Sequence, residues 1–141
     1  MRTKIITLIN AKDSLIKLLT QTMPAKTAYS IIRLAKTVEK EFLIFQEARN
    51  KTILTYCSLD DNKNPIVDDQ NNIVFDGINK EKFYGELNEL LNKEIDIWFD
   101  PITMKDLGDK LELKPTDLLL LEPFIKDEEN TNEEFTTASK E

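Results

Sequence analysis

Histidine is absent from this chain, and cysteine and glycine are scarce. The 141 residues contain no His, one Cys (Cys57) and three Gly. Without His, the chain lacks the imidazole base of serine-type triads and the Cys and His ligand sets of the usual zinc sites. A single Cys cannot form an intrachain disulfide, which is typical of proteins from a reducing compartment such as the cytosol. Three scattered Gly exclude the glycine-rich loops that bind phosphate.

The sequence also lacks an uninterrupted apolar run of the length that a membrane span needs. Its N-terminal segment MRTKIITLINAKDSLIKLL is partly apolar, but Asn10, Lys12, Asp13 and Lys17 interrupt it. We therefore expect neither a signal peptide nor a membrane span, and we expect the protein in the cytosol. A chain of 141 residues can bury a hydrophobic core without disulfides or metal. We expect one domain over residues 1–125.

The most extended regular pattern covers residues 24–56, which contain no Gly and no internal Pro. Apolar residues recur at steps of three and four, which predicts one long helix with an apolar stripe. At about 1.5 Å per residue this helix is roughly 48 Å long, whereas a globule of this size has a radius of gyration of about 14 Å. The helix should therefore extend beyond a spherical domain and pair with another chain, unless the domain itself is elongated. The stripe consists of Ala28, Ile31, Ala35, Val38, Phe42 and Phe45.

The segments around this helix predict a mainly helical α+β fold. We expect a strand at residues 4–9, then a short helix capped by Asn10 that forms a helical hairpin with the long helix. Residues 94–100 alternate apolar and polar side chains, which indicates a strand. Since a lone strand leaves its backbone groups unpaired, we expect this strand to join the N-terminal one in a small antiparallel sheet.

The remaining segments are predicted from turn residues and charge. Residues 58–79 have the Asp, Asn, Pro and Gly content of a loose β-hairpin or ordered loop, and a helix should follow from Asn79. Residues 126–141 contain six acids and two Lys, so we expect a disordered acidic tail.

Charge is divided unevenly along the chain. Residues 1–56 hold ten Lys and Arg against four Asp and Glu, a net charge of +6, whereas the whole chain carries −7 and the rest therefore −13. We expect the two parts to attract each other within the domain or across a dimer. The acidic excess should then face outward.

A basic stripe on the predicted long helix is the candidate for phosphate contacts. Arg33, Lys36 and Lys40 lie on one face of that helix. Acidic residues on the same helix and the negative net charge oppose contact with DNA, so nucleic acid is the less favoured partner.

The acidic segments also suggest metal or acid–base chemistry, but their spacing does not support it. Asp60, Asn62 and Asn64 match the start of a calcium loop, whereas Pro65 stands where Gly is needed and Asn71 where a bidentate Glu is needed. Runs of acids are usually solvated surface. We therefore predict no enzyme activity, no catalytic residues, no metal and no cofactor.

Several segments in sequence order carry a resemblance to a known family. They are a Lys-bearing N-terminal strand, EKEFLIFQEARNKTI, SLDDNKNPIVDDQNNI, FYGELNELLNKEIDIWF and LKPTDLLLLEPFI. In these features the chain resembles a family of small proteins encoded by phages and prophages of low-GC Gram-positive bacteria. The resemblance covers most of residues 1–125 and implies a phage origin and a non-enzymatic role.

We therefore expect a phage-encoded protein-binding module that inhibits a host defence or transcription component. Two alternatives stay open. One is a virion-assembly or accessory protein that forms a homo-oligomer, most simply a dimer, through the long helix, and the other is an acidic mimic of nucleic acid. The predicted interface includes Trp98, whose position in the alternating strand places it opposite the buried side chains, because aromatic anchors are common at interfaces. With it we predict Ala35, Val38, Phe42 and Phe45.

Overall fold

The computed structural model describes residues 1–108 and 110–126, and the predicted acidic tail from residue 127 lies outside them. Helices dominate, and β1 pairs with β2 in an antiparallel sheet, with Thr3 opposite Ile95. The predicted α+β class and the sheet between the N-terminal strand and the 94–100 segment are therefore confirmed. In chain order the elements are β1 (Arg2–Lys4), α1 (Ile5–Leu19), α2 (Ala25–Tyr56), α3 (Gly77–Leu91), β2 (Glu94–Asp96), β3 (Ile102–Thr103), α4 (Met104–Leu107), α5 (Pro115–Leu121), the 3-10 helix η1 (Glu122–Phe124) and β4 (Ile125–Lys126).

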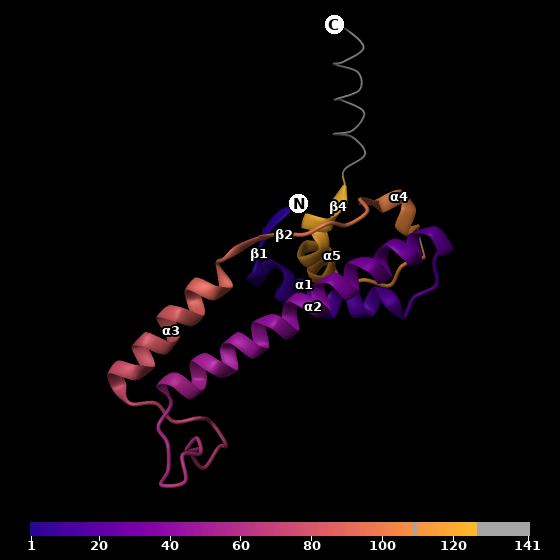
Figure 1. The fold of residues 1–141 in the computed structure, drawn as a ribbon. Helices are drawn as coiled ribbons and strands as arrows, with labels where there is room; N and C mark the ends of the chain where they lie inside the picture. The colour runs from indigo at the N-terminus through magenta and orange to yellow at the C-terminus, as the bar shows by residue number, and fades with distance from the viewer. Residues whose placement is uncertain (109, 127–141) are drawn as a thin grey trace, which may run out of the picture.

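The hydrophobic core lies where α1, the first half of α2 and α5 meet (Figure 1). Helix α1 buries one face because its apolar residues recur at helical spacing. Helix α5 closes the core from the opposite side, and the ring of Phe124 packs edge-on against Phe99 with 5.6 Å between the ring centroids. The buried residues of this core are Leu8, Ala11, Leu15, Leu18, Ile31, Leu34, Val38, Ile97, Ile102, Leu107, Leu121 and Phe124.

Helix α2 continues well beyond this core, and α3 runs back alongside its second half (Figure 1). The predicted long helix and the helical hairpin of α1 and α2 are thus confirmed, but the chain itself covers much of the apolar stripe. Val38 and Phe45 are 1% and 6% exposed. Leu34 is also buried, whereas its neighbour Ala35, a member of the predicted stripe, is only half-buried. The ring of Phe42 lies under the Lys12 ammonium of α1, 3.9 Å from the ring centroid. The domain is elongated around its long helix.

The segment between α2 and α3 contains a repeated eight-residue unit, SLDDNKNP followed by IVDDQNNI. In each unit one Asp oxygen accepts two backbone N–H groups. Asp60 Oδ1 accepts from Asn62 and Asn64 at 2.9 Å each. Asp68 Oδ1 accepts from the backbones of residues 70 and 72 at 2.9 and 2.8 Å. These carboxylates therefore stabilise tight turns, which is why Asp and Asn are frequent in turns.

Three passes of the chain in this segment close into a ring of backbone hydrogen bonds. The N–H of Ser58 donates to Val74 O, that of Val74 to Ile66 O, and that of Ile66 to Ser58 O, each at 2.9 Å. The donors are eight residues apart, the same spacing as the sequence repeat. The predicted hairpin is present as the antiparallel bridge Val67↔Ile73. We call residues 57–76 the distal arm.

Several local predictions were wrong. The strand expected at residues 4–9 ends at Lys4, and α1 begins at Ile5, so Asn10 lies inside the helix and not at its N-cap. The β-branched residues there favour a strand, but burial of Ile5, Leu8 and Ala11 on one helical face outweighs that preference. Helix α3 begins at Gly77, before the expected cap at Asn79.

A second sheet was not predicted at all. Strand β3 pairs in parallel with β4, so that Ile102 lies opposite Ile125 and Thr103 opposite Lys126. Lys126, which was assigned to the tail, is therefore part of the folded domain.

Candidate functional site: an aromatic surface beside a hollow on α2

The chain after β2 crosses the first turns of α2 in an extended conformation and positions Trp98. Backbone groups hold this stretch in place, because Ile97 N donates to Met1 O at 2.8 Å and the Met1 ammonium donates to Ile97 O at 2.7 Å. Ile97 is buried and Phe99 half-buried, whereas Trp98 is 61% exposed. The expected outward orientation of Trp98 is therefore confirmed.

Trp98 contacts a cation on α2. The guanidinium carbon of Arg33 lies 4.4 Å from the centroid of the Trp98 ring and 5.7 Å from that of Tyr29. Tyr29 precedes Arg33 by one helical turn and is also 61% exposed. We call Tyr29, Arg33 and Trp98 the aromatic–arginine surface. Contacts of this kind are worth about 0.5–1 kcal/mol at exposed sites, so they position the rings without burying them.

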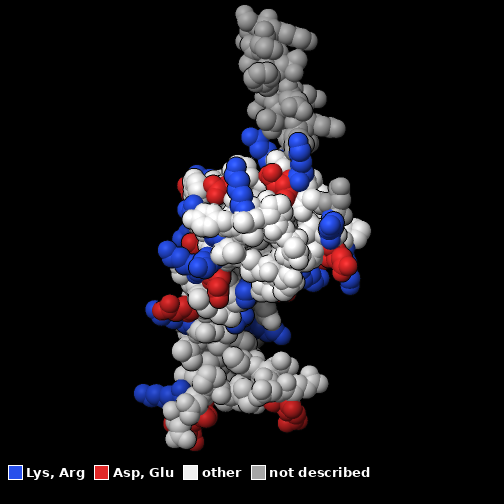
Figure 2. Space-filling view, turned by 90° about the vertical axis from the view of Figure 1, so that its right-hand side faces the viewer, with Lys and Arg blue, Asp and Glu red and all other residues white. Residues whose placement is uncertain are grey.

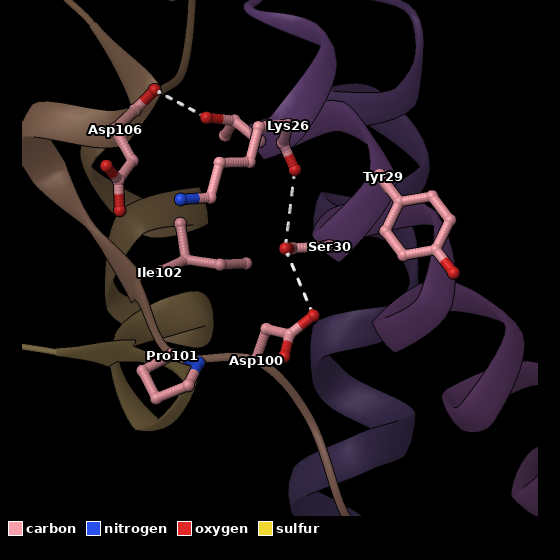
Figure 3. Close-up of a pocket in the computed structure, with 8 residues that line it drawn as sticks. Lys26, Tyr29, Ser30, Asp100, Pro101, Ile102 and Asp106 are labelled. Carbon is pink, nitrogen blue, oxygen red and sulfur yellow. Dashed lines mark hydrogen bonds between the residues drawn. The ribbon is translucent and has the colours of Figure 1, made fainter.

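A hollow of about 610 Å³ adjoins this surface (Figure 3). Lys26, Tyr29 and Ser30 line it from α2, and Asp100 and Pro101 line it from the segment between β2 and β3. Its walls are linked across the opening, because the Ser30 hydroxyl donates to Asp100 Oδ2 at 3.3 Å. The hollow thus combines a cation, a carboxylate and an exposed ring within one open depression.

The second carboxylate of the hollow, Asp106, completes the capping box of helix α4, whose N-cap is Thr103. Thr103 N donates to Asp106 Oδ2, and Asp106 N donates to Thr103 Oγ1, both at 3.0 Å. The hydrogen bond from the Thr103 backbone holds the pKa of Asp106 below its ordinary value of 3.8. Thr27 Oγ1 donates to the Asp106 carbonyl at 3.1 Å and ties α4 to α2. Asp106 is therefore an ionised, structural carboxylate at neutral pH.

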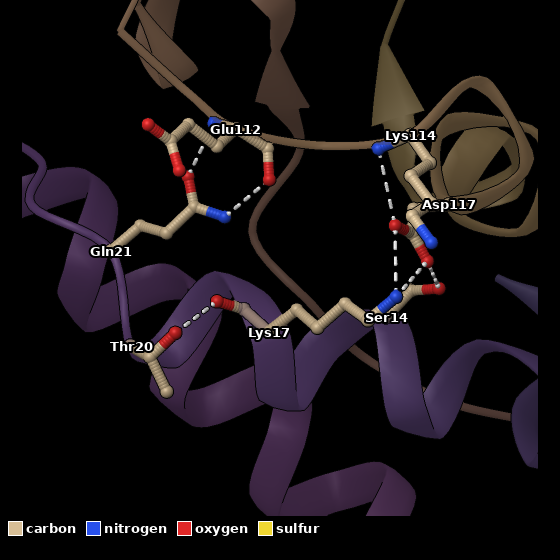
Figure 4. A network of polar contacts seen from close by, with 7 residues as sticks. All are labelled: Ser14, Lys17, Thr20, Gln21, Glu112, Lys114 and Asp117. Carbon is tan, nitrogen blue, oxygen red and sulfur yellow. Dashed lines mark hydrogen bonds and ion pairs between the residues drawn. The ribbon is translucent and has the colours of Figure 1, made fainter.

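A second polar cluster joins α1 to α5 (Figure 4). Asp117, a buried residue, accepts a hydrogen bond from the Ser14 hydroxyl at 2.8 Å and contacts the Lys17 ammonium at 3.2 Å. The hydrogen bond from Ser14 lowers the pKa of Asp117 below its ordinary value. Nearby, the Gln21 side chain pairs in both directions with the backbone of Glu112, at 2.8 and 3.0 Å. These contacts hold the C-terminal segment against α1.

The structure separates the predicted interface residues. Val38 and Phe45 are buried, Ala35 and Phe42 are half-buried along α2, and Trp98 is exposed. Tyr29 and the hollow were missed as site residues, and the local signal for Tyr29 is its position one turn before Arg33. The contact between Trp98 and Arg33 has no local signal, because the two residues are far apart in the sequence.

The predicted phosphate contacts lie on the exposed side of α2, but only partly together. Arg33 packs on Trp98, whereas Lys36 and Lys40 border a shallow depression that also contains Glu39 and Glu47. The basic residues of α2 thus have acidic neighbours.

Opposite charges of the two parts of the chain meet at two ion pairs of the described residues. Arg2 pairs with Glu94 at 2.8 Å, and Lys17 with Asp117 at 3.2 Å. On the face shown in Figure 2, Asp and Glu of the described residues are interspersed with Lys and Arg around an uncharged centre. A continuous row of carboxylates, as a nucleic-acid mimic requires, is not formed by the described residues on that face.

No protein-family model, curated protein or solved structure matches this chain. Within the described ranges, no three or more His, Cys, Asp or Glu gather in a way that would hold a metal ion. None of the helices in those ranges is long and apolar enough to cross a membrane. The functional argument therefore rests on the geometry of the aromatic–arginine surface and its hollow.

Proposed function

We propose that this protein is a non-enzymatic protein-binding module whose contact surface is centred on Tyr29, Arg33 and Trp98. The observation that supports this is the convergence of an exposed Trp, an exposed Tyr and an Arg from two distant segments. These three residue types dominate the binding energy of protein interfaces. The adjoining hollow, which Tyr29 helps to line, accepts a side chain of the partner.

The proposed partner is a host protein that the module inhibits, as a phage protein would inhibit a defence or transcription component. The charges of the hollow support a polar contact at its edge, because Lys26 and Asp100 stand on opposite walls. A virion-assembly role predicts phage structural proteins as partners on the same surface. The identity of the captured protein distinguishes these two roles.

Quantitative co-purification from expressing cells tests the proposal. Trp98→Ala should reduce capture of the partner by about 30-fold or more, since truncation of a central anchor typically costs about 2 kcal/mol or more. Leu119→Ala is the control, because Leu119 is a similarly exposed large apolar side chain on α5 that belongs to neither the aromatic–arginine surface nor its hollow. Equal capture by the wild type and the Trp98 variant would contradict the proposal.

Single-stranded nucleic acid is a second candidate, because the structure places two aromatic rings against a cation of the basic stripe. Arginine and aromatic side chains together form stacking sites for bases. It ranks second because acidic side chains, which repel phosphates, lie beside the basic stripe: Glu39 and Glu47 adjoin Lys36 and Lys40. Trp98 is the single Trp of the chain, so its fluorescence reports directly on this surface. Salt-sensitive quenching by oligothymidylate would reverse the ranking.

A further inference from the structure

A second hollow, of about 810 Å³, lies where the distal arm meets α2 and α3. It shares no lining residue with the aromatic–arginine surface or with the first hollow. Its apolar part includes Phe75 of the arm and Phe83 of α3, whose rings stack with 4.7 Å between centroids. Ile53, Leu87 and Tyr84 extend this apolar lining.

Two cations line the same hollow. Arg49 contributes from α2 and Lys80 from the first turn of α3. The Nε atom of Arg49 is buried and has no hydrogen-bond partner among the described residues. The three ion pairs found within the described ranges join other side chains. A buried N–H of a charged group without a partner is costly. Arg49 as a whole is only half-buried and lines the hollow, so an acceptor there meets the guanidinium through its other N–H groups.

The polar neighbours of Arg49 match an anionic group. Asn71 and Asn72 provide amide donors at the rim. Asp68 is the one acid among the lining residues, and its Oδ1 already accepts the two backbone N–H groups of its turn. The hydroxyl of Tyr56 donates to Glu86 Oε1 at 2.7 Å and ties the last turn of α2 to α3. The cations are therefore held on helices whose spacing is fixed.

We propose that this hollow binds a peptide carboxylate that stands next to an apolar side chain. Arg49 donates to the carboxylate oxygens with its planar fork, which suits carboxylates in particular. Lys80 adds positive charge at the entrance, and the apolar side chain lies on Phe75, Phe83 and Tyr84. The volume of the hollow lies within the usual range for binding pockets.

Titration with N-acetyl-L-phenylalanine, followed by NMR of the backbone amides, tests this proposal. The compound carries one carboxylate beside one aromatic side chain, and N-acetyl-L-phenylalanine amide is its uncharged counterpart. We expect saturable shifts around Arg49, Asn72 and Tyr84, with a dissociation constant on the order of 1 mM, as for a fragment-sized ligand. The amide should bind about tenfold more weakly or worse.

Substitutions identify the groups responsible. Arg49→Gln should abolish saturable binding, and Arg49→Lys should not restore it, because Lys lacks the planar fork. Lys80→Gln should weaken binding about threefold to tenfold. Lys82→Gln, an exposed neighbour on α3 outside the lining, should have no effect.

Three results would overturn the proposal: equal binding of the acid and the amide, shifts that map elsewhere on the molecule, and the absence of saturable shifts. Inorganic phosphate serves as a further probe. If phosphate binds as tightly as the acid, the apolar lining contributes nothing and the assignment to a peptide carboxylate is wrong. Should Arg49→Gln fail to fold, the comparison of acid with amide and of Lys80→Gln with Lys82→Gln still decides the outcome. This test is independent of Trp98 and of the proposed partner.

Discussion

The burial of Phe45 tests whether the apolar stripe of α2 is covered by its own chain or by a second chain. Phe45 is 6% exposed within a single chain, whereas Leu43, two residues earlier on α2, is 56% exposed. Truncation of a buried Phe to Ala costs about 3–5 kcal/mol, from lost transfer free energy and the cavity left behind. Phe45→Ala should therefore lower the free energy of unfolding by about 3–4 kcal/mol. Leu43→Ala should lower it by less than about 1 kcal/mol.

Urea unfolding followed by circular dichroism at 222 nm measures both changes, because the signal reports total helix and α2 is the longest helix. Thermal unfolding gives a second measure. For a domain of this size, 1 kcal/mol of unfolding free energy corresponds to a shift in Tm of roughly 3–5 °C, so Phe45→Ala should lower Tm by about 10–15 °C. We expect the urea midpoint to be the same at low and high protein concentration, since the single chain buries Phe45. A midpoint that rises with concentration would refute the reasoning, because it would show that a second chain contributes to the burial. A larger loss of unfolding free energy for Leu43→Ala than for Phe45→Ala would also show that a second chain contributes to the burial.

Three further changes test the polar contacts. Ser14→Ala should destabilise the protein at neutral pH, and the difference should shrink below about pH 4. The reason is that the pKa of Asp117 is lowered in the folded state, so its contribution is present above the ordinary carboxyl pKa and is lost as the pH falls through the folded value. Urea midpoints across this pH range measure the effect, and a constant difference would contradict it. Thr103→Ala removes the cap of α4 and should cost about 1 kcal/mol in thermal unfolding, whereas an unchanged midpoint would show that the cap with Asp106 is not formed. Trp98→Ala should change the unfolding free energy by less than about 1 kcal/mol, since the ring is mostly exposed, and a larger loss would place Trp98 in the core.

The pairing of the N-terminal strand with the 94–100 segment was predictable because it follows from local pattern and from the need of backbone groups for partners. Residues 94–100 show the alternation of a strand, and a short strand needs a partner for its backbone groups. The observed pairing of β1 with β2 meets that need. The parallel pair of β3 and β4 was not predictable in this way, because each strand has two residues and no alternation can be recognised over that length.

The amino-acid sequence by itself determined the long helix of residues 25–56 and excluded imidazole chemistry and intrachain disulfides. These conclusions depend on local composition and on periodicity, which act within a few turns of the chain. The sequence did not determine what covers the helix, because the same apolar stripe suits a second chain and the chain's own α1 and α3. Only the tertiary structure decided that Phe45 is buried within one chain, that Arg33 meets Trp98, and that Arg49 lines a hollow with its Nε atom unpartnered among the described residues. Each of these depends on contacts between residues far apart in sequence, whose free energy is settled by packing and not by local preference.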